Sequence, residues 1–184
     1  MRRNNLSTLD EISHYRRSHP AANLIIDTNV LLLFFIGVFD SNYLAECPLM
    51  TDNGRNYCDE HFKLMEKILG LFIDKVIITP HVLSEINMLS RTRIKPKTRM
   101  NDFFLKLIQR LERCKEEQIG LKIILKNGGV LEFGFTDISL IEVATKNSWV
   151  IITDDFDLYR TYKEKIPVIY FNNIVANDLC KVSL

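Results

Sequence analysis

The segment NLIIDTN, residues 23–29, decides the fold of this chain. Its three successive apolar residues are typical of a short buried strand, and the run ends abruptly at Asp27. In an open α/β sheet, ligands bind at the carboxyl ends of the strands, near the point where the strand order reverses, so Asp27 is a candidate site residue. An acid after a strand also commonly caps the next helix, and this segment alone leaves both interpretations open.

After this segment, patterns of helical and strand length alternate along the chain. Residues 28–39 are apolar almost all round, as in a buried helix, and residues 59–73 have apolar positions at three- and four-residue spacing. We expect strands at residues 75–78, near 123, at 149–152 and at 167–171, and further helices at 80–90, 101–116, from 136, at 154–164 and from 172. Strands separated by helices predict right-handed βαβ units and a parallel sheet.

Length and composition indicate a single globular domain. The chain has 184 residues, 47% of them hydrophobic and 26% charged, which is enough to bury a core and too apolar for disorder. We expect a polar arm at residues 1–22 and one domain at residues 23–184. Residues 41–58 are rich in turn-forming residues and are predicted to be a loop or an insertion.

The cysteines and the apolar runs favour a cytoplasmic protein. The four cysteines are far apart and form no CxxC motif, so we expect reduced thiols. The first 20 residues contain no apolar core of a secretory signal. The most apolar run, residues 30–39, is about half the length of a membrane span, so we expect no contact with a membrane.

The charge of the chain is nearly balanced. A formal net charge of +1 excludes the simplest signature of a nucleic-acid-binding protein, so any such partner must contact a local patch. One candidate patch is RTRIKPKTR, residues 91–99, whose basic side chains suit phosphates: Arg91, Arg93, Lys95, Lys97 and Arg99. A solvated basic loop is the alternative.

Acidic residues occupy equivalent boundaries in the predicted alternation. Asp27 ends the first strand, Glu85 lies in the helix after the second, Asp137 opens a later helix, and Asp154 and Asp155 end the strand near residue 150. Right-handed parallel units bring these positions to one edge of the sheet. Carboxylates about 4–6 Å apart repel by roughly 1 kcal/mol or more per pair, which protons or cations must neutralise. Oxygen ligands without His or Cys suit Mg²⁺ or Mn²⁺, ions that activate water against a phosphodiester.

Four short motifs resemble those of the PIN-domain nucleases. They are IIDTN at 25–29, TPHVLSEI at 79–86, TDISLIEVA at 136–144 and VIITDDFDL at 150–158, and the resemblance covers about residues 23–171. It implies that the metal ligands and catalytic residues are Asp27, Glu85, Asp137 and Asp155. Asp154 and Asp157 are then outer or structural carboxylates, while Asn29 and Thr153 either orient a carboxylate or a water or only form turn hydrogen bonds.

The resemblance also implies a fold and an activity. The fold would be α/β, a parallel sheet of four to five strands flanked by helices on both faces in three layers. The activity would be that of a Mg²⁺- or Mn²⁺-dependent endoribonuclease that hydrolyses RNA, often the toxin of a toxin-antitoxin pair with an antitoxin partner, and often a homodimer. The arm and the 41–58 segment depart from small PIN toxins, so another PIN branch is an alternative to a toxin. A non-cleaving PIN-like module that binds RNA or protein is the alternative to an enzyme.

Overall fold

The computed structural model describes residues 18, 23–51 and 56–179, so nearly all of the predicted arm lies outside the described residues. Its sheet contains five parallel strands in the order β3-β2-β1-β4-β5. Their bounds are β1 (Leu24–Ile26), β2 (Val76–Ile78), β3 (Lys115–Glu116), β4 (Val150–Thr153) and β5 (Val168–Tyr170). The predicted parallel α/β fold is therefore confirmed.

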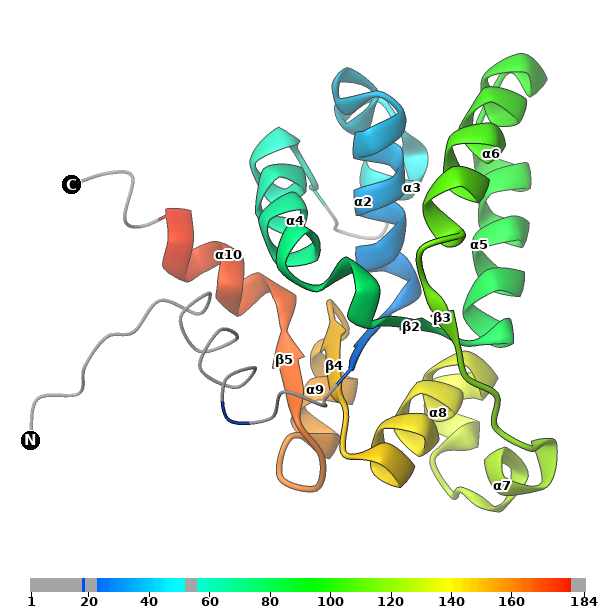
Figure 1. Ribbon diagram of the computed structural model, residues 1–184, viewed down its shortest axis with the longest axis vertical. Coiled ribbons are helices and arrows are strands. Elements are labelled where there is room, and N and C mark those ends of the chain that lie inside the picture. Colours follow the sequence, from blue (N-terminus) through cyan, green and yellow to red (C-terminus); the bar gives the residue numbers. More distant parts are fainter. Residues whose placement is uncertain (1–17, 19–22, 52–55, 180–184) are drawn as a thin grey trace, which may run out of the picture.

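Helices connect all of these strands. The α-helices are α2 (Thr28–Phe39), α3 (Pro48–Thr51), α4 (Asp59–Phe72), α5 (Pro80–Arg93), α6 (Lys97–Leu111), α7 (Leu121–Lys126), α8 (Val130–Asn147), α9 (Phe156–Tyr162) and α10 (Phe171–Leu179), and the 3₁₀ helices are η1 (Ser41–Ala45) and η2 (Ile73–Lys75). Figure 1 shows α2, α4, α5 and α6 above the strands and α7 and α8 below them. The sheet is thus the middle of three layers, as right-handed crossovers in two directions require.

Helix α2 forms the centre of the upper layer. It packs against α4, α5 and α6, so its residues from Val30 to Ile36 are all buried and no polar face is needed. At Gly37 the helix approaches α4 so closely that an added Cβ would overlap the ring of Phe62. A glycine is required there by close packing, and its position fixes how α4 lies on α2.

Three local expectations differ from the structure. The predicted loop at residues 41–58 contains η1 and α3, whose short turns carry too few residues for a periodic signal. The strand expected near residue 123 is wrong, because that residue belongs to α7. The third strand is instead Lys115–Glu116, which is exposed and polar at the sheet edge, and helix α6 starts and ends earlier than the predicted 101–116.

The described residues also bear on the predictions for cysteines and membranes. Cys47, Cys58 and Cys114 are free thiols, while Cys180 lies outside the described residues. Among the helices that the structure describes, none is long and apolar enough to cross a membrane.

Candidate active site

The strand order reverses between β1 and β4, which lie side by side in the sheet. Ile26 lies opposite Ile152, so the two strands end within one residue of each other. The backbone N–H of Asp27 continues the pairing by donating to the carbonyl of Ile152 at 2.9 Å. Because ligands bind at such a switch point in open α/β sheets, the polar residues that follow these two strands form the candidate site.

Asp27 occupies the N-cap position of α2, but its side chain makes no capping hydrogen bond. The carboxylate is 4% exposed and its Oδ2 accepts a hydrogen bond of 2.8 Å from the Thr153 hydroxyl. Thr153 is fully buried and in turn accepts from the backbone N–H of Asp155 at 2.9 Å. The backbone of Asp27 therefore starts a helix, while its carboxylate is held by the end of β4.

Helix α5 brings Glu85 toward the same edge. The helix begins at the predicted place, because the Thr79 hydroxyl accepts from the N–H of Val82 at 3.3 Å and Pro80 follows. Glu85 then lies in the second turn, where its Oε2 accepts a hydrogen bond of 2.8 Å from the hydroxyl of Thr28. Thr28 is the residue after Asp27, so this bond ties α5 to the end of β1.

Helix α8 contributes Asp137. The helix is kinked at Gly134, whose φ of 80° lies in the left-handed region that glycine adopts without strain. Asp137 lies in the first turn after the kink, which agrees with the helix start predicted at Thr136. The hydroxyl of Ser139 donates to the Thr136 carbonyl at 2.6 Å and lies 3.2 Å from the hydroxyl of Thr79, so the restarted helix is tied to the start of α5.

The electrostatics show that these acids face one another. Burial raises the pKa of Asp137 from its ordinary value of 3.8 to about 7, with further increases from the charges of Asp155, Glu85 and Asp154. Burial also raises the pKa of Asp27 well above its ordinary value, helped by Asp154 and Asp137, while the Thr153 hydrogen bond opposes this. Among the described residues, the charged neighbours that act on both groups are carboxylates, so the cluster concentrates negative charge.

Asp154 and Asp155 have different environments. Asp155 caps α9, because its Oδ1 accepts from the N–H of Leu158 at 2.9 Å. Asp154 accepts at both oxygens, from Asn29 Nδ2 at 3.3 Å and from the hydroxyl of Tyr57 at 2.7 Å. Asp154 is also the acid whose charge raises the pKa of both Asp27 and Asp137. The predicted supporting residue Asn29 thus holds a carboxylate of the cluster.

For two residues, Asp157 and Tyr57, the structure differs from the site predicted from the sequence. Asp157 points away from the cluster: its side chain is 68% exposed and lies 3.3 Å from Arg160 in an ion pair on α9. Tyr57 was not among the predicted site residues, although its hydroxyl contacts the cluster. It lies in the segment predicted to be a loop or insertion, and nothing in the local pattern distinguishes it from other aromatic residues.

The donor atoms fit a hard divalent cation. Among the described residues, the cluster offers carboxylate and hydroxyl oxygens, and burial together with the neighbouring acids raises the pKa of Asp27 and Asp137. No set of three His, Cys, Asp or Glu side chains in the described parts of the chain is arranged as a finished metal site. Several oxygens are instead turned to hydroxyl or backbone donors, as at Asp155 and Glu85.

Two comparisons with known proteins found no match to this chain. No family model matches the chain. No curated protein matches it either. The resemblance to PIN-domain nucleases therefore rests on the four motifs of the sequence.

The predicted basic segment lies at the far end of α5 and the start of α6. Arg93 is eight residues beyond Glu85, about 12 Å along the helix axis. Arg91 donates to Asn87 Oδ1 at 2.8 Å and Arg99 stacks over the ring of Tyr43 at 4.3 Å, so these two cations already contact the protein. Lys95 and Lys97 are exposed.

A groove of about 550 Å³ lies elsewhere, between α2, α4 and α6. Its lining includes none of the clustered acids and is largely cationic over an apolar floor: Phe34, Val38, Lys63, Glu66, Lys67, Leu69, Gly70, Arg110 and Arg113. The clustered acids of the switch point therefore lie outside this groove.

Proposed function

We propose that this protein is a Mg²⁺- or Mn²⁺-dependent endoribonuclease with a PIN-like site. The observation that carries the proposal is the partly buried carboxylate cluster at the switch point, where burial first, and then the charges of neighbouring acids, raise the pKa values of Asp27 and Asp137. Such a cluster costs folding free energy unless a cation compensates it. Oxygen-only sites of this kind favour divalent ions that act on phosphodiesters.

The residues that would hold the ions are Asp27, Glu85, Asp137 and Asp155, with Asp154 beside them. When bound, such an ion lowers the pKa of a water molecule and stabilises the charge that develops on a phosphodiester. Thr153 and Thr28 donate their hydroxyl hydrogens to Asp27 and Glu85, which fixes the direction of both carboxylates. Water activated at the ion is the proposed attacking group.

Chelation tests the proposal directly. Purified protein is expected to cleave single-stranded RNA internally when Mn²⁺ or Mg²⁺ is added and to lose that activity with excess chelator, because the carboxylates alone repel a phosphate. The measurement is the appearance of fragments from an end-labelled oligoribonucleotide on a gel. Activity that is unchanged by the chelator would reject the mechanism. RNA binding without cleavage at any Mn²⁺ concentration would favour the non-cleaving module.

We also propose that the 91–99 segment contacts RNA phosphates. The double substitution Lys95→Glu with Lys97→Glu is expected to raise the Kd for RNA about tenfold and to flatten its salt dependence, since two cations no longer displace counterions. The matched control is Lys67→Glu with Arg110→Glu, which changes the charge equally but in the α2, α4 and α6 groove. Fluorescence anisotropy at several salt concentrations compares the two. Weaker binding in the control pair alone would place the strand in the groove.

A further inference from the structure

Tyr57 is an unexpected member of the site. It precedes α4 and lies outside all four motifs, yet it is 4% exposed and its hydroxyl donates to Asp154 Oδ2 at 2.7 Å. The Asp154 carboxylate is the one whose charge acts on both Asp27 and Asp137. A residue of the segment that the motifs treat as an insertion therefore reaches the centre of the acidic cluster.

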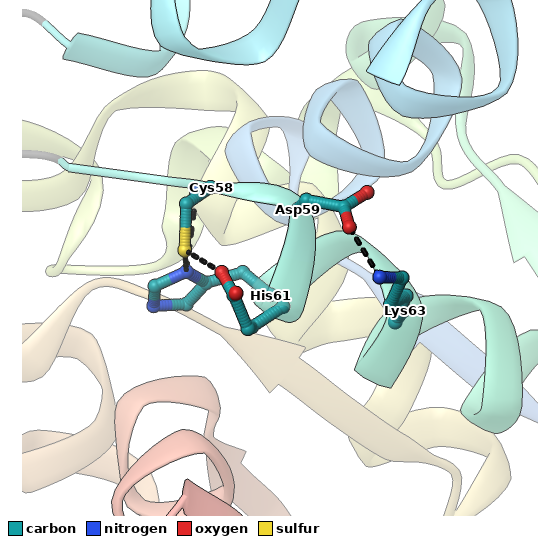
Figure 2. A network of polar contacts seen from close by, with 5 residues as sticks. Cys58, Asp59, His61 and Lys63 are labelled. Atoms are coloured by element: carbon teal, nitrogen blue, oxygen red, sulfur yellow. Dashed lines mark hydrogen bonds and ion pairs between the residues drawn. The ribbon is translucent and has the colours of Figure 1, made fainter. Parts of the chain in front are cut away.

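The ring of Tyr57 packs against two other rings, which also contact each other. It meets the ring of Phe171 edge-on with centroids 6.1 Å apart, and that of His61 edge-on at 5.5 Å. His61 is itself fixed at the start of α4, because its Nδ1 accepts from the N–H of Cys58 at 3.2 Å. Figure 2 shows the Cys58 thiol against the His61 ring, 2.9 Å from Nδ1, while the thiol donates to Glu60 Oε2 at 2.8 Å. This small polar network orders the chain just where Tyr57 must point inward.

We propose that Tyr57 is a positioning residue that, together with Asn29, holds Asp154 in place beside the divalent-ion site. The proposal rests on the function proposed above. With one oxygen bound by Tyr57 and the other by Asn29, the carboxylate cannot rotate away from Asp27 and Asp137, although their charges repel it. The chain between α2 and α4 is then part of the active site.

Removal of the Tyr57 hydroxyl is expected to weaken the binding of Mn²⁺. Tyr57→Phe keeps the ring contacts with His61 and Phe171 but removes the short, charge-assisted hydrogen bond to Asp154 Oδ2. Groups that orient the ligands of a metal ion commonly change its affinity by 10- to 100-fold when they are lost. The Kd for Mn²⁺ is therefore expected to rise about tenfold in Tyr57→Phe.

The experiment titrates Mn²⁺ into the full chain by calorimetry, without RNA. Tyr162→Phe is the matched control, because Tyr162 is also buried but its hydroxyl lies beside Gly129 rather than at the clustered acids. It is expected to bind Mn²⁺ as the wild type does. Thermal unfolding in chelator checks that both variants fold. Asp154→Asn and the double variant with Tyr57→Phe are expected to bind equally weakly, because the tyrosine acts through Asp154.

The outcomes separate this inference from the proposed function. An unchanged Kd for Mn²⁺ in folded Tyr57→Phe overturns the positioning role, even if the wild type cleaves RNA. Additive losses in the double variant also overturn it, since they would show that Tyr57 acts independently of Asp154. Mn²⁺ binding by the wild type without RNA cleavage rejects the nuclease proposal alone, and the tenfold weaker binding of Tyr57→Phe would still support the positioning role.

Discussion

Asp27→Asn and Asp137→Asn are each expected to lower metal-dependent RNA cleavage at least about 1,000-fold, or roughly 4 kcal/mol in transition-state free energy. Asparagine has nearly the shape of aspartate, so the packing around the buried Asp27 is retained while its charge is lost. A neutral amide is a far weaker ligand for Mg²⁺ or Mn²⁺ than a carboxylate. The measurement is the initial rate of fragment formation at saturating Mn²⁺.

Asp157→Asn is the matched control for this result. It makes the same chemical change on α9, two residues beyond Asp155, but at an exposed side chain that pairs with Arg160. Its cleavage rate is expected to stay within about twofold of the wild type, because surface ion pairs contribute little. Equal cleavage by the wild type and both cluster variants, at saturating Mn²⁺, would contradict the proposed mechanism.

In the presence of chelator, the free energy of unfolding is expected to decrease as the pH rises from about 4 to 7. The pKa of Asp137 is about 7 in the folded protein, whereas an unfolded aspartate titrates near 3.9, so between these values the folded state binds a proton that the unfolded state has released. Stability is then complete below the unfolded pKa and is lost as the pH passes the folded pKa. The raised pKa of Asp27 acts in the same direction.

The size of this effect is on the order of 2 kcal/mol, after allowing for partial solvent screening of Asp137. Asp137→Asn is expected to remove the part of the pH dependence that Asp137 contributes, leaving that of Asp27, and to be more stable than the wild type at pH 8, while Asp157→Asn keeps the wild-type slope. Denaturant unfolding at a series of pH values measures both. A stability that increases with pH in this window, in chelator, would show that the acids do not repel one another in the folded protein.

The two expectations together describe a site that opposes folding. The carboxylates that the proposed chemistry needs are the same ones whose burial and mutual repulsion destabilise the metal-free protein. Saturating Mn²⁺ is therefore expected to restore stability at neutral pH, because ions that bind only the folded state stabilise it. Substitution of a catalytic carboxylate is thus expected to raise the free energy of unfolding in chelator, whereas substitution of a stabilising residue lowers it.

The local sequence was sufficient to predict the central strand and the helices next to it. The apolar run before Asp27, the long apolar helix after it and the Thr79-Pro80 helix start all appear in the structure at the predicted places. They were predictable because full burial leaves a continuous apolar pattern and because helix caps depend on neighbouring residues. The edge strand at Lys115–Glu116 lacked such a signal, since it is exposed and only two residues long.

The sequence by itself determined that acids follow successive strands of a parallel α/β chain, and hence that several of them gather at one sheet edge. Only the tertiary structure decided which side chains form hydrogen bonds to these acids. Asp154 and Tyr57 are 97 residues apart in the sequence, and the Tyr57 ring packs against the rings of His61 and Phe171 where the two meet. Long-range packing has no periodicity along the chain, so the same tyrosine that appeared to belong to an insertion is placed at the acids only by the fold.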